Sequence, residues 1–365
     1  MKRHNRLKKH TLGLAAALLV TAGMSQIALA GDSVYVNTSS LRYRTSAQIK
    51  DNNIAGNLSY GQKLERVGTS GQWTMILLNG KKYYVSSAYV TSKEPASAGA
   101  VQTTSQTAAG AQTSGGTAIA LSSNYKYANY SKINSGTATL YRSTASNKKN
   151  KVVCVNAGHG TNGGGSVKTQ CHPDGSAKVT GGTTGAGATS AVAVSSGMTF
   201  ADGTAESKVT LAMAKVLKTK LLNAGYDVLM IRESDDVQLD NIARTVIANN
   251  NADCHIALHW DSTSSNKGAF FMSVPSNATY RAMEPVASHW KQHNQLGESL
   301  ISGLKSAGVK IYSKGSMEMD LTQTSYSTIP SVDIELGDKA SDHSGATLET
   351  LANGLLTGVN TFFGQ

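Results

Sequence analysis

From Lys151 onward, short apolar runs alternate with segments of helical periodicity. VVCVNA, YDVLM, CHIALH and SVDIEL are typical of buried strands. ESKVTLAMAKVLKTKLLN carries apolar residues at helical spacing, and Gly225 follows it as a helix-ending residue. Further helices are expected over 239–251, near 281–306 and near 344–359. This alternation predicts an α/β domain with a mainly parallel twisted sheet and helices on both faces.

Residues 31–92 have a different pattern. VYVNTSSLRYR, GNLSYGQKLERVG, WTMILL and KKYYVSSAYV alternate apolar and polar residues, and glycines separate several of them. Asn79-Gly80, between two of these runs, is a strong hairpin signal. Short strands in so brief a segment predict a small all-β barrel.

The first 30 residues belong to neither domain. Five basic side chains lie within Met1–His10, an apolar run comes next, and Ala28-Leu29-Ala30 is a small-x-small cleavage pattern. This order predicts a secretory signal peptide over 1–30. The apolar run is too short to span a bilayer comfortably, which disfavours an uncleaved anchor. We therefore expect a secreted protein, extracellular or associated with a cell wall, with no membrane span after signal cleavage.

Between the two domains the composition changes again. Residues 93–120 are mostly Ala, Ser, Thr, Gly and Gln, which predicts a flexible linker. Residues 121–150 are polar and mixed, and we interpret them as a lead-in segment whose ATLYRS run adds an edge strand. The α/β domain is expected to span 151–365.

The net charge limits the expected classes of binding partner, and the cysteine count indicates the state of the thiols. Removing the five leader charges from the formal net charge of +11 leaves +6, which suits an anionic wall polymer or simply gives solubility. There is no compact Lys/Arg cluster, so nucleic acid is a poor candidate. Cys154, Cys171 and Cys254 are odd in number, and the first and last lie in apolar runs, which favours buried free thiols.

Chemistry-bearing side chains recur where the predicted strands end. His159 comes just after one strand, His259 ends another, Glu335 lies near the end of a third, and Glu206 opens a helix. Parallel sheets place their sites at the carboxyl ends of the strands. Two His and a Glu around an open position form a catalytic zinc ligand set, and a further carboxylate can act as general base.

Each of these residues also has a structural explanation. Glu206 can stabilise a helix N-terminus, His159 can be a loop residue, and His259 can be a hydrogen-bonded core histidine. A carboxylate in a buried strand needs a strong partner, which makes Glu335 harder to explain structurally. Spacing alone leaves both interpretations open.

The segments around these positions resemble the N-acetylmuramoyl-L-alanine amidases of the third amidase family. That family has a strand ending in a GHG turn, a Glu opening a helix, a strand ending in ADxxxSIHxN and a late P-x-x-L-V-E-x-G strand. The corresponding segments are AGHGTNGG (157–164), AESKVTLAMAKVLKTKL (205–221), ADCHIALHWDS (252–262) and PSVDIELG (330–337). They occur in the family's order within 151–363, and four ordered motifs are far more specific than one.

The resemblance implies the fold of these amidases, with His159, Glu206 and His259 binding Zn²⁺ and Glu335 as the catalytic carboxylate. It implies peptidoglycan as the substrate, cut by a zinc-activated water between N-acetylmuramic acid and L-alanine. A zinc peptidase cutting within the stem peptide would use the same metal chemistry. A non-catalytic wall-binding protein would need neither an open zinc site nor a base.

Residues 32–92 resemble bacterial SH3-like (SH3b) domains. VNTSSLRYRTSA and GQWTMILLNGKKYYVSSAYV match the opening and closing segments of that family. Such modules commonly bind cell-wall peptides, so peptidoglycan is expected as an anchoring surface as well as the substrate. The sequence indicates no protein partner.

The chain also departs from the amidase pattern. The 46 residues between His159 and Glu206 exceed the usual spacing and hold Cys171, His172 and Asp174. We expect an ordered loop that lies near the metal at its ends only. Asp261 replaces the family Asn, Ser325 a common Arg, and Asp338 a common aromatic residue. These changes leave the expected metal ligands intact and concern the substrate side.

Overall fold

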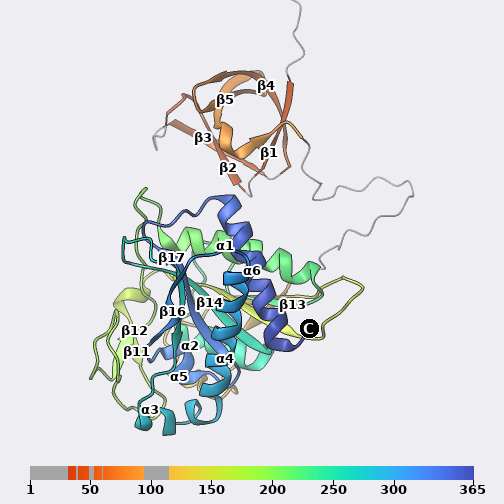
Figure 1. Cartoon of the computed structure of the whole chain (residues 1–365). Coiled ribbons are helices and arrows are strands. Elements are labelled where there is room, and N and C mark those ends of the chain that lie inside the picture. The colour runs from red at the N-terminus through yellow and green to blue at the C-terminus, as the bar shows by residue number, and fades with distance from the viewer. Residues whose placement is uncertain (1–31, 38–39, 49–52, 60, 94–114) are drawn as a thin grey trace, which may run out of the picture. The chain divides into compact units, whose positions relative to one another are not determined.

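The structure, a computed structural model, describes residues 32–37, 40–48, 53–59, 61–93 and 115–365 (Figure 1). The chain divides into two compact units, one up to Ser105 and one from Gln106. The signal peptide predicted for 1–30 and most of the predicted linker lie outside the described residues.

The N-terminal unit contains one antiparallel sheet with the strand order β3-β2-β6-β5-β4-β1-β7. Its core includes Val36, Ile76 and Val85, which are fully buried. Asn79 and Gly80 both have positive φ, as a two-residue hairpin turn requires, and the predicted β5–β6 hairpin is confirmed. The strands are β1 Asp32–Val36, β2 Ser40–Arg44, β3 Ile54–Ser59, β4 Lys63–Ser70, β5 Trp73–Leu78, β6 Lys81–Ser86 and β7 Val90–Thr91.

The second unit is built on an eight-stranded mixed sheet with the order β16-β15-β17-β14-β10-β13-β9-β8. The four central strands β17, β14, β10 and β13 are parallel, whereas β15 and β9 pair with them in the antiparallel sense. The α/β prediction is therefore confirmed, with a sheet that is parallel at its centre and mixed at its edges. The strands are β8 Thr117–Ala120, β9 Thr137–Tyr141, β10 Val152–Ala157, β13 Asp227–Met230, β14 Cys254–Asp261, β15 Ala269–Ser273, β16 Ile311–Glu318 and β17 Ser331–Asp338.

The two outermost strands on one side come from segments expected to precede the domain. β9 lies within the predicted lead-in, 121–150, and adds to the sheet as expected. The edge itself is β8, so the linker predicted over 93–120 extends too far at its C-terminal end. The TAIA sequence of β8 is mostly exposed. An edge strand can pair through its backbone without large apolar side chains, which is why its composition suggested a linker.

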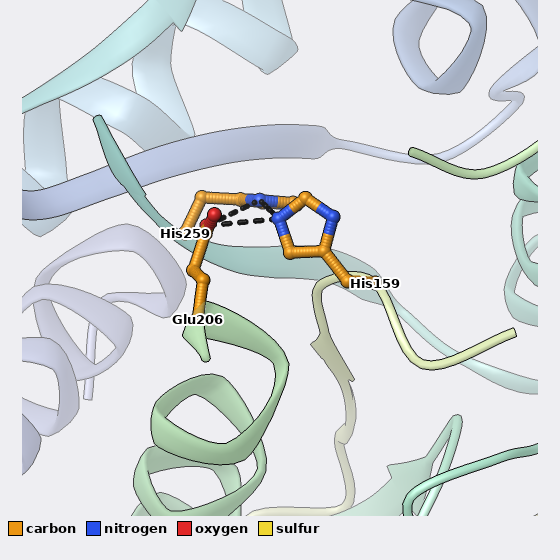
Figure 2. Close-up of side chains that lie close together, drawn as sticks. All are labelled: His159, Glu206 and His259. Carbon is orange, nitrogen blue, oxygen red and sulfur yellow. Dashed lines mark hydrogen bonds and ion pairs between the residues drawn. The ribbon is translucent and has the colours of Figure 1, made fainter. Parts of the chain in front are cut away.

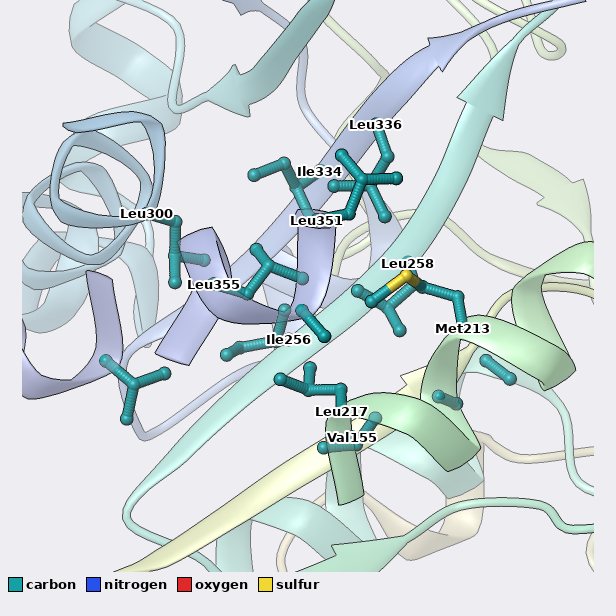
Figure 3. Packing of buried hydrophobic residues seen from close by; sticks show 14 of the residues in the cluster. Val155, Met213, Leu217, Ile256, Leu258, Leu300, Ile334, Leu336, Leu351 and Leu355 are labelled. Atoms are coloured by element: carbon teal, nitrogen blue, oxygen red, sulfur yellow. The ribbon is translucent and has the colours of Figure 1, made fainter. Parts of the chain in front are cut away.

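Helices cover both faces of the central strands. On one face α1, α4 and α6 pack together, and their apolar side chains meet those of the sheet in the largest core (Figure 3). On the other face α2 packs against β10 and β14, with α5 beside it. Across the described residues, no helix combines the length and apolar character needed to span a bilayer. The helices are α1 Glu206–Asn223, α2 Asn241–Asn251, α3 Ala278–Ala282, α4 Val286–Ser306, α5 Thr322–Tyr326 and α6 Gly345–Phe363.

The insert, residues 160–204, is folded and fixed to the second unit. It contains a small two-stranded sheet, β11 Lys168–Gln170 with β12 Ser190–Val192. The fully buried carboxylate of Asp320 accepts hydrogen bonds from His172 Nε2 at 3.0 Å and Lys178 Nζ at 3.1 Å. Two backbone N–H groups of the insert donate to the same carboxylate. Asp320 lies between β16 and α5, so this cluster fixes the insert to the segment that joins these two elements.

His255 and His293 are two of the buried histidines in the second unit. His255 in β14 is fully buried, and burial together with the nearby Arg244 lowers its pKa to about 3. His293 in α4 is also buried, and burial and the neighbouring His289 lower its pKa to about 3. Both imidazoles are therefore neutral in the folded chain over a range where the unfolded chain protonates them.

We expect replacement of His255 by leucine to make the free energy of unfolding less dependent on pH. Below about pH 6.5 the unfolded chain binds a proton that folded His255 excludes, so wild-type stability falls as pH drops toward 3. Between pH 7.5 and 5 this one group should lower wild-type stability by about 2 kcal/mol. Denaturant unfolding at both pH values, with a metal chelator present, measures the difference. Equal pH dependence of the free energy of unfolding in the two proteins would contradict the lowered pKa of His255.

Candidate metal centre

Three separate elements bring the predicted metal ligands to the carboxyl edge of the sheet (Figure 2). His159 lies two residues after β10, His259 lies in β14, and Glu206 is the first residue of α1. β10 and β14 are parallel neighbours, so their carboxyl ends lie side by side. Glu335, in β17, pairs in register with His259 from the other side. The structure therefore brings together all four residues that the sequence singled out.

The ligand atoms of His159, Glu206 and His259 form a compact triangle. His159 Nε2 lies 2.9 Å from Glu206 Oε1 and 3.1 Å from His259 Nδ1. His259 Nδ1 lies 3.2 Å from Glu206 Oε1. Ligands about 2.0 Å from a tetrahedral zinc ion are separated by about 3.3 Å. Two imidazole nitrogens and one carboxylate oxygen at these distances fit one face of such a tetrahedron.

The second nitrogen of His159 determines which atom is available to a metal. His159 Nδ1 lies 2.9 Å from the backbone carbonyl of Ser195, in the insert. A carbonyl can only accept, so the Nδ1 proton is held there and the Nε2 lone pair faces the triangle. This contact gives the C-terminal part of the insert a direct role in orienting His159.

The backbone of His159 is in the left-handed region, with φ of 63°. Such a conformation is costly for a non-glycine residue and needs support from its surroundings. Two buried arginines supply it. Arg232 donates from Nε to the carbonyl of Ala157 and from Nη2 to that of Gly158, at 3.0 and 2.8 Å. Arg244 donates from Nη2 to the carbonyl of His159 at 2.7 Å.

Glu206 is buried and fully hydrogen-bonded. Its Oε2 accepts from the backbone of Met198 at 2.9 Å, and its Oε1 accepts from the backbone of Trp260 at 3.0 Å. Burial alone raises the pKa of this carboxyl, but the imidazoles of His159 and His259 outweigh that effect and lower it well below the usual value. Glu206 is thus ionised in the ordinary pH range, as a metal ligand must be.

Glu335 has the opposite environment. It is buried, its Oε2 has no hydrogen-bond partner among the described residues, and it lines the same cavity as the triangle. Burial and the neighbouring Asp333 carboxylate raise its pKa well above the usual value. A carboxylate that accepts no structural hydrogen bond through one oxygen remains able to accept a proton from a reacting group.

The site lies in a cavity of about 520 Å³. The insert forms much of its wall: its C-terminal part contacts the candidate ligands, as expected, and its middle, which was not expected there, also lines the cavity. Lys178 and residues 182–184, from the middle of the insert, line the cavity, as do 194–198 near its end. The anchor at Asp320 explains this, because it holds the middle of the insert beside Met319 and Leu321, which line the same cavity.

The three substituted positions have separate surroundings. Asp261 lines the cavity and forms an ion pair with Lys267 at 2.5 Å. Ser325 is buried and hydrogen-bonds the hydroxyl of Tyr280, outside the cavity lining. Asp338 accepts from backbone N–H groups of the adjoining loops. Only Asp261 of the three therefore faces the cavity.

Sequence reasoning missed one acidic side chain at the site. Asp333 lines the cavity, and its Oδ2 lies 3.6 Å from His259 Nε2. The two-residue period of a strand places it on the same face as Glu335 and could have identified it. Arg232 and Arg244 were also missed, because nothing in the sequence indicates that their partners are the backbone of a distant turn.

We expect Gly197→Ala to weaken zinc binding about tenfold or more. Gly197 has φ of 81°, and a Cβ there would lie 2.7 Å from His159 Cδ2 and 2.9 Å from Glu206 Oε2. Two ligands would have to move. Competition with a chromophoric chelator measures the affinity.

Gly203→Ala is the matched control. Gly203 has a similar φ of 86°, but no atom lies within 4 Å of an added Cβ. Backbone strain is therefore shared by the two variants, and only Gly197→Ala disturbs the ligands. Equal zinc affinities would show that the insert does not hold the ligands in place.

Several solved amidase structures are similar to this chain. A solved N-acetylmuramyl-L-alanine amidase, Ami1 from Mycobacterium smegmatis, is 18% identical, covering 60% of this chain and 99% of its own, with a TM-score of 0.49. The amidase from Clostridium difficile 630 is 16% identical over 59% and 97%, with a TM-score of 0.42. AmiC2 of Nostoc punctiforme is 15% identical over 60% and 99%, with a TM-score of 0.42. Likenesses of this extent do not by themselves assign the chain to a family.

The assignment rests on a family model. A search of curated protein sequences gives no match. The model described as N-acetylmuramoyl-L-alanine amidase matches residues 153–353, more than half of the chain. This range contains His159, Glu206, His259 and Glu335, and thus the whole of the predicted site. The chain therefore belongs to the N-acetylmuramoyl-L-alanine amidase family.

Proposed function

We propose that this amidase is zinc-dependent, with His159, Glu206 and His259 holding the metal and Glu335 acting as the catalytic carboxylate. The family gives the reaction, hydrolysis of the amide between N-acetylmuramic acid and L-alanine in peptidoglycan. The observation that carries the zinc proposal is the triangle of two imidazole nitrogens and a carboxylate oxygen, all within 4.8 Å of one another. Imidazole and carboxylate are ligands that suit Zn²⁺.

Bound zinc would polarise the scissile carbonyl and lower the pKa of a coordinated water from about 15.7 toward about 7. The residues of the chain supply the remaining parts of the reaction. Glu335 accepts the proton of the attacking water and passes it to the departing amine of L-alanine. Its Oε2 has no competing hydrogen bond among the described residues, which leaves it available for both transfers.

The lining of the cavity includes both polar and apolar residues. Its lining combines hydroxyl groups of Thr183 and Thr184 with the apolar side chains of Met272, Met317 and Met319. Such a surface can contact both the polar and apolar parts of a peptidoglycan strand. A peptidase cutting within the stem peptide would use the same residues, and product analysis separates the two reactions.

We also propose that the N-terminal unit anchors the enzyme to the wall and that the protein is exported. Residues 32–92 are an all-β unit that resembles SH3b domains in sequence, and we propose that they anchor the enzyme to the wall. The basic leader with its cleavage pattern supports secretion, which would bring the enzyme to a place where peptidoglycan is accessible. Peptidoglycan is thus proposed as both substrate and anchoring surface.

We expect Glu335→Gln to lower the rate of peptidoglycan digestion by about 100- to 10,000-fold, the usual contribution of a general base. Zinc should remain bound, because Glu335 lies outside the triangle. His159→Ala should lose zinc as well as activity. Digestion of purified peptidoglycan with added zinc, followed by mass spectrometry, measures the products, and elemental analysis measures the metal.

Each outcome of this experiment has a distinct meaning. Glycan freed of peptide, with new L-alanine amino ends, supports the proposed function. New amino ends inside the stem peptide would assign the peptidase reaction instead. Normal digestion by Glu335→Gln would show that Glu335 is not the catalytic carboxylate. Activity of the wild-type enzyme without zinc would show that the reaction does not require the metal.

We expect deletion of residues 32–92 to reduce retention on insoluble walls while leaving the hydrolysis of soluble peptidoglycan fragments unchanged. The metal ligands and Glu335 all lie in the second unit, so the deletion removes none of the proposed catalytic groups. Co-sedimentation with purified walls measures retention. Full retention of the shortened enzyme would show that the N-terminal unit is not the anchor.

A further inference from the structure

Asp333 is an acidic residue of the site to which the proposed reaction assigns no role. It lies in β17 two residues before Glu335, so both side chains project from the same face of the strand. Its strand neighbour in β14 is Ala257, two residues before His259. The family pattern P-x-x-L-V-E-x-G carries leucine at this place, so the carboxylate departs from that pattern.

Asp333 faces the far side of the His259 ring. His259 Nδ1 points at His159 Nε2 and Glu206 Oε1, at 3.1 and 3.2 Å. The other nitrogen, Nε2, points toward Asp333 Oδ2 at 3.6 Å. Asp333 therefore lies on the side of the imidazole away from the triangle, and it is not part of the three-residue cluster.

An imidazole that coordinates a metal through Nδ1 must carry its proton on Nε2. That proton needs an acceptor, which fixes both the tautomer and the rotation of the ring. His159 already has such an acceptor in the Ser195 carbonyl. Asp333 Oδ2 faces His259 Nε2 at 3.6 Å, so a small shift of either side chain gives the second histidine an acceptor of its own.

A second observation supports the same assignment. Asp333 Oδ1 is buried and has no hydrogen-bond partner among the described residues. A carboxylate held with an unpartnered buried oxygen stabilises a fold poorly. Its placement is explained by what its other oxygen faces, the Nε2 atom of His259.

We propose that Asp333 is a positioning residue that holds His259 in the tautomer and orientation needed to bind zinc through Nδ1. This inference rests on the proposed zinc site and goes beyond it by assigning a residue that neither the ligand triangle nor the general base includes. Leucine, the residue of the family pattern, fills similar space but accepts no hydrogen bond.

The test compares zinc affinity in Asp333→Leu, Asp333→Asn and wild-type full-length protein, by competition with a chromophoric chelator. Asp333→Leu should bind zinc 10- to 100-fold more weakly, the usual effect of losing such an acceptor. Asp333→Asn should lose less, because its amide oxygen still accepts a hydrogen bond. The visible spectrum of the cobalt-loaded proteins should change in Asp333→Leu, since the geometry of the His259 ligand changes.

Asp261→Asn is the matched control. Asp261 lines the same cavity but is paired with Lys267. Its zinc affinity should stay within about twofold of wild type, because it faces neither imidazole of the triangle. Unfolding of the chelator-treated proteins separates positioning from a purely structural role. Asp333→Leu should be as stable as wild type or more stable, because the buried unpartnered oxygen is gone.

The outcomes separate this inference from the function on which it rests. Wild-type zinc affinity in a folded Asp333→Leu protein overturns the inference and leaves the zinc site standing. Loss of affinity that merely accompanies a loss of stability also overturns it. A wild-type protein that binds no zinc overturns both the inference and the proposed zinc site.

Discussion

The site depends on two buried guanidinium groups that hold one strained turn. After β10 ends at Ala157, the chain places His159 in the left-handed region, at a cost of about 1–3 kcal/mol. The carbonyls on both sides of Gly158 accept hydrogen bonds from Arg232 and Arg244. Without these donors the buried carbonyls of Ala157 and His159 would lose these hydrogen bonds, and the turn would lose much of the support for its shape. In this conformation His159 Nε2 lies 2.9 Å from Glu206 Oε1.

The hydrogen bonds from Arg232 and Arg244 also explain why the geometry of the site depends on the whole centre of the sheet. Arg232 comes just after β13, Arg244 lies in α2, and the turn they hold comes just after β10. His259 comes from β14 on the other side of β10. Strands and a helix distant in sequence therefore converge on a few backbone atoms. Packing of α2 and β13 against β10 is thus a condition for the geometry of the ligands, and stability and site geometry share the same contacts.

Periodicity and the carboxyl-edge rule account for the part of the fold and site that could be predicted from the sequence. Apolar runs and helical spacing located the central strands and helices, and the rule placed His159, His259 and Glu335 together. The insert could not be predicted in this way, because its polar, glycine-rich composition is that of a loop. Its fold depends on Asp320, which lies far along the chain and accepts hydrogen bonds from His172, Lys178 and the backbone of Val179. Asp333 was not identified from the sequence, because Glu335, two residues later in the same strand, already provided a candidate carboxylate.

The distribution of charge gives the strongest physical reason for a metal at this edge. Glu206, Asp333 and Glu335 bring three buried or partly buried carboxyl groups around two imidazoles. Burial alone lowers the pKa of His259, but the carboxylates of Asp333 and Glu206 outweigh it and raise the pKa to about 10. The same burial raises the pKa values of Asp333 and Glu335. Acidic groups so placed destabilise one another unless a cation lies among them. A divalent ion in the triangle would supply that charge at the point where the ligand atoms already converge, so the negative charge that is costly for the fold would favour metal binding.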